Sequence, residues 1–159
     1  MDMLFQCMDN QSVGIELLEY QFSQRNNGLG DSHEPEKWII ISVSVKSNVG
    51  NWDAKDPSLE IDDLPIISDW FKTLSQNRPV KYEGNLSFTE PCLEFQLLNS
   101  FDSPIKRIKI KIGGELYPKW DWEKYNYAEI IFEADNQQLI RLAHELFQNY
   151  TDFLKRNNR

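Results

Sequence analysis

Alternating apolar and polar residues predict β-strands over much of this chain. The clearest run covers residues 38–45, in which Ile39, Ile41, Val43 and Val45 share one face of an extended chain. Comparable alternation predicts further strands over residues 13–22, 80–88, 93–97, 108–112 and 127–133. In the first of these the alternation slips by one residue between two neighbouring leucines, which indicates a bulge or a bend. The first 22 residues are therefore one bent strand or two short ones.

Two segments instead follow the 3.6-residue period of an amphipathic helix. The first, at about residues 63–77, begins where Asp62 or the aspartate after it can cap the helix, and a proline lies in its first turn. The second, at about residues 135–155, begins with a capping box in which Asp135 caps the helix and the Gln138 side chain reaches back to it. Both helices have one apolar stripe, so each is expected to pack on a sheet.

The order of these elements indicates the fold class. Most links between strands are short turns, so neighbouring strands are expected to be antiparallel. No internal repeat or change of composition divides the chain. We therefore predict an α+β fold in a single domain over residues 1–159, with a largely antiparallel sheet of about six to seven strands and the two helices packed on it.

Residues 46–62 interrupt the pattern with a glycine, a proline and several charged residues. They are predicted to form an exposed loop that leads into the first helix. Trp52, Asp53 and Asp56 lie in this segment. Protein-binding surfaces use aromatic side chains as anchors and charged side chains for steering. These three residues are therefore candidate partner-binding residues.

Charge narrows the possible classes of function. The 159 residues include 17 Lys and Arg against 25 Asp and Glu, which gives a formal net charge of −8. A chain with this balance repels nucleic-acid phosphates and anionic membranes, so neither is expected as a partner. Residues 31–65 carry eight of the acids and only three bases. This part of the surface either steers a basic protein partner or only keeps the protein in solution.

The N-terminal residues show no basic segment and no apolar run of signal-peptide length, and no run approaches the ~18 apolar residues of a membrane helix. The expected location is the cytoplasm. Cys7 and Cys92 lie far apart and lack the spacing of a redox or metal-binding pair. Both are predicted to be buried free thiols.

Candidate catalytic chemistry is sparse. His144 is expected on the polar side of the second helix, and His33 lies beside Glu34 and Glu36 in a polar segment that binds a metal only with help from distant ligands. The sequence contains no HExxH motif, no glycine-rich phosphate loop and no EF-hand. We therefore predict no enzyme activity, no catalytic residues, no metal and no cofactor.

One stripe reverses the acidic balance: Arg107, Lys109 and Lys111 alternate with isoleucines. It has two interpretations, a nucleic-acid contact or one half of a set of cross-strand charge pairs on a solvated sheet face. The neighbouring strands have acidic residues at positions expected to face outward, which favours the cross-strand charge pairs. These acids are Glu83, Glu94, Glu129 and Glu133.

Residues 117–125 interleave aromatic and charged side chains. Exposed aromatics among charges anchor protein partners. In the alternative, Trp120 and Trp122 fold back over the core. Together with Asp121 and Glu123 they complete the set of candidate partner-binding residues.

Several short segments of the chain occur in an order that is found in a known protein family. They are Glu36-Lys37-Trp38-Ile39-Ile40, Leu59 followed by Asp63-Leu64, Phe88 to Phe95, Ile108 to Gly114, and Ile131 to Leu139 leading into the last helix. In this order the chain resembles the WapI family of bacterial immunity proteins. The resemblance covers the chain from about Leu4 to Leu154.

The resemblance implies a non-enzymatic antitoxin that stays in the cytoplasm and binds the toxic C-terminal domain of a large WapA-like cell-wall-associated protein used in contact-dependent competition. Toxins of this kind are often nucleases with basic clefts, which an acidic binder complements. Two other classes remain open: a general protein-interaction or adaptor module, and a small-molecule-binding domain, which needs a concave apolar pocket. The oligomeric state is left open.

Overall fold

The computed structural model describes residues 3–22, 37–81, 84–121 and 126–157. In this part of the chain eight strands form two four-stranded antiparallel sheets, which confirms the predicted α+β class. The first sheet contains β1 (Met3–Gln6), β2 (Ser12–Tyr20), β3 (Trp38–Ser47) and β4 (Gly50–Glu60) in that order. The second contains β5 (Asn85–Leu86), β6 (Leu93–Leu97), β7 (Ile105–Gly113) and β8 (Tyr127–Asp135). Helix α1 (Asp63–Ser75) connects the sheets along the chain, and α2 (Asn136–Asn157) follows β8.

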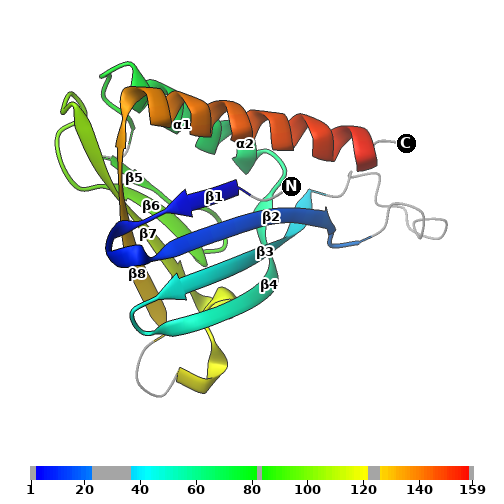
Figure 1. The fold of residues 1–159 in the computed structure, drawn as a ribbon. Helices are drawn as coiled ribbons and strands as arrows, with labels where there is room; N and C mark the ends of the chain where they lie inside the picture. Colours follow the sequence, from blue (N-terminus) through cyan, green and yellow to red (C-terminus); the bar gives the residue numbers. More distant parts are fainter. Residues whose placement is uncertain (1–2, 23–36, 82–83, 122–125, 158–159) are drawn as a thin grey trace.

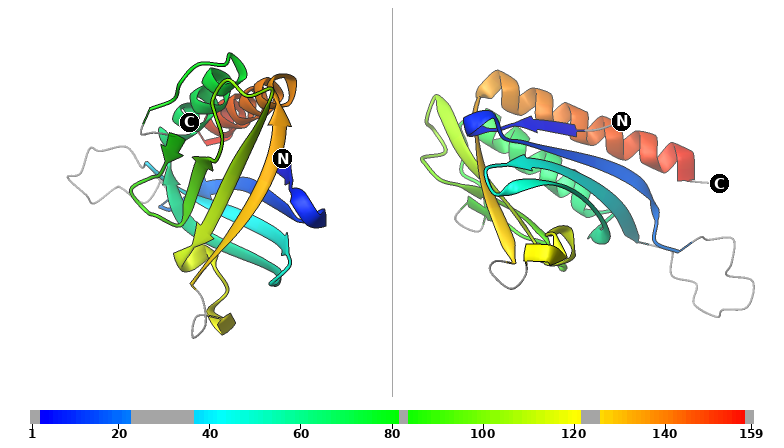
Figure 2. Two further views of the ribbon diagram at one scale, coloured as in Figure 1. Left: turned by 90° about the vertical axis from the view of Figure 1, so that its left-hand side faces the viewer. Right: turned by 60° about the horizontal axis from the view of Figure 1, so that its bottom comes forward.

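The two sheets face each other across the core, and both helices close the same side of it (Figures 1 and 2). Strands β6 to β8 cross the direction of β2 to β4, and α1 and α2 lie against one another. The strands therefore do not form the single sheet that we predicted. The chain leaves the first sheet through α1 and starts a second sheet when it returns. Within the described ranges no helix is long and apolar enough to cross a membrane.

The predicted alternation is confirmed in both sheets. Ile39, Ile41, Val43 and Val45 are all buried on the inner face of β3. The register between β2 and β3 shifts between Leu17 and Glu19, at the predicted slip, because one extra residue there moves the pattern to the other phase. The N-terminal residues form two strands, β1 and β2, joined by a short 3₁₀ helix at Met8–Asn10.

The prediction of a loop at residues 46–62 is wrong, because most of this segment is β4. Its apolar residues meet apolar partners on β3: Trp52 pairs with Val45, Ala54 with Val43 and Leu59 with Ile39. Strand β4 lies at the edge of its sheet, where a proline is tolerated because one side makes no ladder hydrogen bonds. Its outward residues remain polar and hide the strand signal. This strand accounts for the count of eight rather than seven.

The helix ends agree in part with the predicted caps. At the start of α2 the capping box is confirmed: the Gln138 N–H donates to Asp135 Oδ1 and the Asp135 N–H donates to Gln138 Oε1, both at 2.8 Å. At the start of α1 the Asp62 side chain makes no cap hydrogen bond. Instead Asp63 Oδ2 accepts a 2.8 Å hydrogen bond from the Glu60 N–H and ties the end of β4 to the helix. Burial raises the pKa of the Asp63 carboxyl above its ordinary value.

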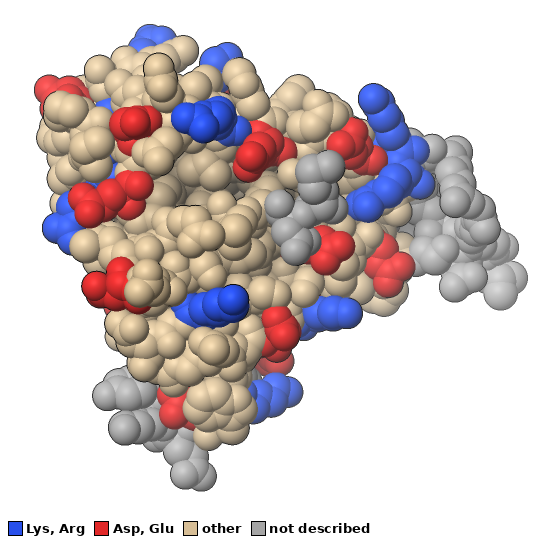
Figure 3. Space-filling model, in the orientation of Figure 1, with Lys and Arg blue, Asp and Glu red and all other residues tan. Residues whose placement is uncertain are grey.

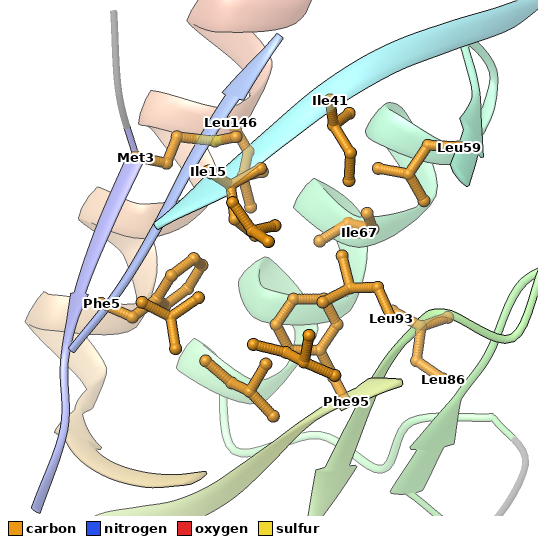
Figure 4. Packing of buried hydrophobic residues seen from close by; sticks show 14 of the residues in the cluster. Met3, Phe5, Ile15, Ile41, Leu59, Ile67, Leu86, Leu93, Phe95 and Leu146 are labelled. Carbon is orange, nitrogen blue, oxygen red and sulfur yellow. The ribbon is translucent and has the colours of Figure 1, made fainter. Parts of the chain in front are cut away.

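An aromatic cluster joins the sheets and α1 at the centre of the core, and Figure 4 labels two of its rings, Phe5 and Phe95. Phe5 on β1 and Phe71 on α1 contact each other and both Phe95 on β6 and Phe132 on β8, with ring centroids 5.4 to 6.3 Å apart. Because these rings come from both sheets and a helix, the two sheets share one core. Each ring removes a large apolar surface from water.

Among the residues that the structure describes, one charged side chain is buried. Lys106 on β7 is fully buried, and its Nζ donates to Asn136 Oδ1 at 2.6 Å and to Asn77 Oδ1. Asn77 follows the end of α1 and Asn136 begins α2, so the ammonium group links both helices to the second sheet. Burial lowers the pKa of the Lys106 ammonium.

Candidate functional site

The structure brings together two predicted candidate segments, the start of β4 and residues 114–121. Trp52 lies between the sheets with 9% of its surface exposed, and its Nε1 donates a 2.9 Å hydrogen bond to the Leu116 carbonyl. The Tyr117 ring meets the Trp52 ring edge-on at 5.5 Å between centroids, and its hydroxyl donates to the Asp121 carboxylate. Trp52 therefore holds the segment that carries the other candidates and is not itself an exposed anchor.

Trp120 lies at the surface of this segment. Its side chain is 68% exposed, so Trp120 does not fold back over the core. One edge of the ring lies against Gly50, where an added Cβ would come within 3.3 Å of Trp120 Cη2. Gly50 has a φ of +138°, which only glycine adopts readily, so the ring rests on bare backbone. The candidates Trp122 and Glu123 lie outside the described residues.

Asp53 and Asp56 do not form one acidic cluster. Asp53 pairs with Ser44 on the outer face of the first sheet, and its Oδ1 accepts a 2.6 Å hydrogen bond from Ser44 Oγ. Asp56 pairs with the buried Ile41, and its Oδ2 accepts a 2.6 Å hydrogen bond from Ser58 Oγ. Three residues apart on a strand, the two carboxylates point to opposite faces.

The acidic surface is also less uniform than the sequence suggested. Acidic and basic side chains are interspersed on the face shown in Figure 3, and an uncharged area lies across its middle. Lys55 lies between the acids of β4, and Lys37 Nζ lies 3.8 Å from Glu60 Oε1. The acids at residues 31–36 lie outside the described part. Among described residues, the idea of an acidic loop before α1 is therefore replaced by a mixed strand.

A groove of about 600 Å³ lies beside Tyr117. Its walls are formed by Met8, Asp9 and Gln11, by the turn at residues 47–49 between β3 and β4, by Arg107 of β7 and by residues 127–131 of β8. We call it the β8 groove. Two apolar side chains on its walls are exposed, Val49 at 56% and Tyr127 at 43%.

Val49 and Tyr127 were not among the sequence candidates. Val49 lies in a polar turn, and Tyr127 is the first residue of an alternating strand. In each case one apolar residue stands where the pattern expects a polar one. That signal is too weak to separate a binding residue from ordinary surface, because single exposed apolar residues are common.

A second groove, of about 880 Å³, runs between α1 and α2. We call it the interhelix groove. Ile66 and Phe147 are exposed on its walls, and His144 lies at its side and is exposed as predicted. Trp70 is buried in its wall, and among the described residues its Nε1 has no hydrogen-bond partner.

The basic stripe on β7 lies beside acids of the neighbouring strands, the arrangement of the second interpretation, and one of its bases forms an ion pair. Lys109 Nζ lies 2.6 Å from Glu129 Oε2 on β8. In register, Arg107 faces Glu133 and Lys111 faces Glu129 on one side and Glu94 on the other. Glu83 lies outside the described residues. Each base of the stripe therefore lies opposite or beside an acid, which offsets its positive charge.

The described residues also bear on metal binding and nucleophilic chemistry. In the described ranges no group of three or more His, Cys, Asp or Glu side chains is arranged to hold a metal ion. Cys92 is buried, while Cys7 is only half-buried. Burial raises the pKa of the Cys7 thiol to about 11, so the reactive thiolate is scarce at neutral pH. His33 lies outside the described residues.

Comparisons with known proteins complete the description of the site. A search of curated proteins found no match. A solved structure, described as that of the plant transcriptional regulator PBF-2, aligns at 10% sequence identity and a TM-score of 0.49, covering 98% of this chain and 82% of that one. The model of the immunity protein WapI-like family matches residues 4–154. This chain therefore belongs to the immunity protein WapI-like family.

Proposed function

We propose that this chain is a single immunity-protein domain that acts as a cytoplasmic, non-enzymatic antitoxin. It binds the toxic C-terminal domain of a cognate WapA-like cell-wall-associated toxin and blocks it by covering its surface in a stoichiometric complex. Family membership over residues 4–154 carries this proposal. The net charge of −8 favours a basic toxin, such as a nuclease domain, because opposite charge speeds encounter.

The surface around Trp120 is the proposed contact with the toxin. Trp120 is largely exposed, and a tryptophan at the centre of an interface often supplies much of the binding energy. Asp121 beside it and Asp53 on the outer face of β4 supply the acidic charge. Trp122 and Glu123 are proposed to extend this surface on sequence grounds. Trp52 supports the surface from within.

Co-expression with the toxin domain encoded immediately upstream tests the proposal. The immunity protein is expected to restore growth and to co-purify with the toxin domain in equal amounts. A toxin domain from an unrelated system is the matched control and should be neither neutralised nor bound. Failure of both rescue and co-purification with the cognate domain would show that the proposal is wrong. An adaptor module, the alternative class, is expected to bind a partner while leaving the toxin active.

One observation favours small-molecule binding as a second candidate function. The interhelix groove has apolar side chains such as Ile66 and Phe147 among polar ones on its walls, and its volume is in the range of ligand pockets. A thermal-shift screen of small apolar molecules tests it: a ligand of this groove should raise the Tm, and Ile66→Ser should remove the shift. If no compound raises the Tm, or if the shift survives in Ile66→Ser, the groove is not the ligand site.

A further inference from the structure

The interhelix groove collects apolar side chains from both helices and from the segment that follows α1. Ile66 on α1 and Phe147 on α2 lie on its walls with 52% and 51% of their surfaces exposed. The half-buried Val80 and the buried Leu86 of β5 line it as well. Covering the exposed apolar surface is favourable, because it releases that surface from water. The volume of about 880 Å³ fits one small organic molecule.

Trp70 adds an unpaired hydrogen-bond donor to the same wall. Its ring packs edge-on against Phe71, with the ring centroids 5.2 Å apart, and only 6% of its surface is exposed. In the described part of the chain, Trp70 Nε1 is the one buried side-chain nitrogen or oxygen atom without a hydrogen-bond partner. Buried donors are almost always paired, and an exception often indicates an acceptor that water or a ligand supplies. An occupant with an oxygen atom is therefore favoured over a hydrocarbon.

The charged side chains around the groove are mostly basic, in contrast to the net charge of −8 of the whole chain. Lys72 and Lys81 lie on its walls together with one acid, Asp69. An adjoining hollow shares Asp69 and Lys72 with the groove and adds Arg78. All four side chains are exposed, and none forms an ion pair with another described residue. Three cations against one anion give this rim a positive field, which attracts anions.

We propose that the interhelix groove binds an amphiphilic organic anion, a carboxylate with a medium-length alkyl chain. This inference rests on small-molecule binding, the second candidate function above, and specifies the class of ligand. The alkyl chain covers Ile66 and Phe147, and the carboxylate pairs with Lys72 and Lys81. The Trp70 N–H then has a carboxylate oxygen as an available acceptor.

Two larger occupants fit the groove less well. The toxin is proposed to be basic, so Lys72, Arg78 and Lys81 would repel it. A second copy of this chain that used the same groove about a twofold axis would bring these three cations close to their own equivalents. Like charges at short distance oppose both contacts. A small anion meets neither obstacle.

Titration with octanoate and with octanol tests the charge preference. The two ligands have alkyl chains of the same length, and a purely apolar groove should prefer the alcohol, because a carboxylate loses more hydration on binding. We expect octanoate to bind about threefold more tightly than octanol at low salt and to lose this advantage at high salt. In NMR spectra, shifts of Ile66, Phe147 and the Trp70 indole N–H should accompany binding.

Paired lysine substitutions test the rim. Lys72→Met with Lys81→Met should weaken octanoate binding about fivefold and leave octanol binding within about twofold. Lys46→Met with Lys55→Met is the matched control: it changes the net charge equally, but both lysines are exposed on the first sheet, outside the groove. This control should leave both affinities within about twofold.

A matched pair of isoleucine substitutions tests the apolar wall. Ile66→Ser should weaken the binding of both ligands about threefold or more, because it removes apolar surface that the alkyl chain covers. Ile105→Ser removes an isoleucine that is 45% exposed on β7, outside the groove, and should leave both affinities unchanged.

The possible outcomes separate the anion from the groove itself. If octanol binds as tightly as octanoate, or if the two lysine pairs have equal effects, the inference is wrong and the groove remains a candidate small-molecule site. If neither ligand binds, the second candidate function is wrong as well, and the antitoxin proposal is unaffected. If the protein is a dimer that Ile66→Ser converts to a monomer, the groove is an interface between two copies, which overturns the inference.

Discussion

The indole Nε1 of Trp52 donates a 2.9 Å hydrogen bond to the backbone carbonyl of Leu116, 64 residues further along the chain. Trp52 lies on β4, an edge strand of the first sheet, and Leu116 ends the 3₁₀ helix Gly114–Leu116 that follows β7 of the second sheet. The bond is buried, so no water competes for either group. This contact holds the segment with Trp120 and Asp121 against the body of the protein.

Trp52→Phe should lower the free energy of unfolding by about 1–2 kcal/mol, because a smaller aromatic ring still fills most of the site but the Leu116 carbonyl loses its buried donor. Urea unfolding followed by circular dichroism measures the change. Trp120→Phe is the control and should change stability by less than about 0.5 kcal/mol. If Trp52→Phe left stability unchanged but weakened toxin binding, Trp52 would contact the toxin directly, against our assignment.

Trp120→Ala should weaken toxin binding but leave stability nearly unchanged, the reverse of what we expect for Trp52→Phe. Its exposed ring contributes little to the core, so stability should stay within about 0.5 kcal/mol of the parent protein. Loss of a central interface tryptophan typically weakens binding by about 2 kcal/mol or more, which is about thirtyfold in Kd. Calorimetric titration with the toxin domain measures this loss. Phe147→Ala removes an exposed aromatic ring from α2 and serves as control; an equal loss there would show that the contact surface is misplaced.

Asp53→Lys should slow association with a basic toxin and flatten the dependence of the on-rate on salt, because Asp53 lies exposed on the outer face of β4. Stopped-flow mixing at several salt concentrations measures both effects. Asp56→Lys changes the same charge on the opposite face, so it should slow association less. Equal effects of the two variants would mean that only the net charge matters.

Alkylation of the native protein should show the high pKa of Cys7. With a pKa of about 11 against the ordinary 9.0, Cys7 should react with iodoacetamide at pH 8 about a hundredfold more slowly than an unperturbed thiol. The rate should keep rising up to about pH 11. The unfolded chain loses this proton first, so stability should fall as the pH rises from 9.0 to about 11.

Mass spectrometry of the alkylated protein identifies the modified thiol. The control Cys7→Ser should abolish the slow reaction, because Cys92 is buried and stays protected in the folded protein. Rapid labelling of Cys7 at pH 7 would contradict the raised pKa.

The two helix starts provide a matched pair of substitutions. Asp135→Ala removes a confirmed cap of α2 and should lower the free energy of unfolding by about 1 kcal/mol. Asp62→Ala removes a side chain that makes no cap bond at α1 and should change it by less than about 0.5 kcal/mol. Thermal or urea unfolding distinguishes these values. A larger loss at Asp62 than at Asp135 would reverse the assignment of the caps.

Local patterns predicted the elements whose signal is carried by neighbouring residues. The isoleucines at 108, 110 and 112 are buried as their alternation indicates, and the bulge after Leu17 lies at the slip in the pattern. The capping box of α2 needs only two side chains three residues apart. Strand β4 was missed because its own residues do not alternate clearly between apolar and polar. Its apolar residues indicate a strand only when they are seen beside their apolar partners on β3.

The sequence by itself determined the α+β class, both helices, most strands, the position of acids beside the basic stripe and membership of an immunity-protein family. Tertiary structure alone decided that Trp52 is buried while Trp120 is exposed, that Asp53 and Asp56 point apart, and that residues 127–131 of β8 line a groove. The physical reason is that periodicity reports only which side of an element is apolar. Exposure of a particular tryptophan or strand edge depends on which other element packs against it, and those elements come from distant parts of the chain.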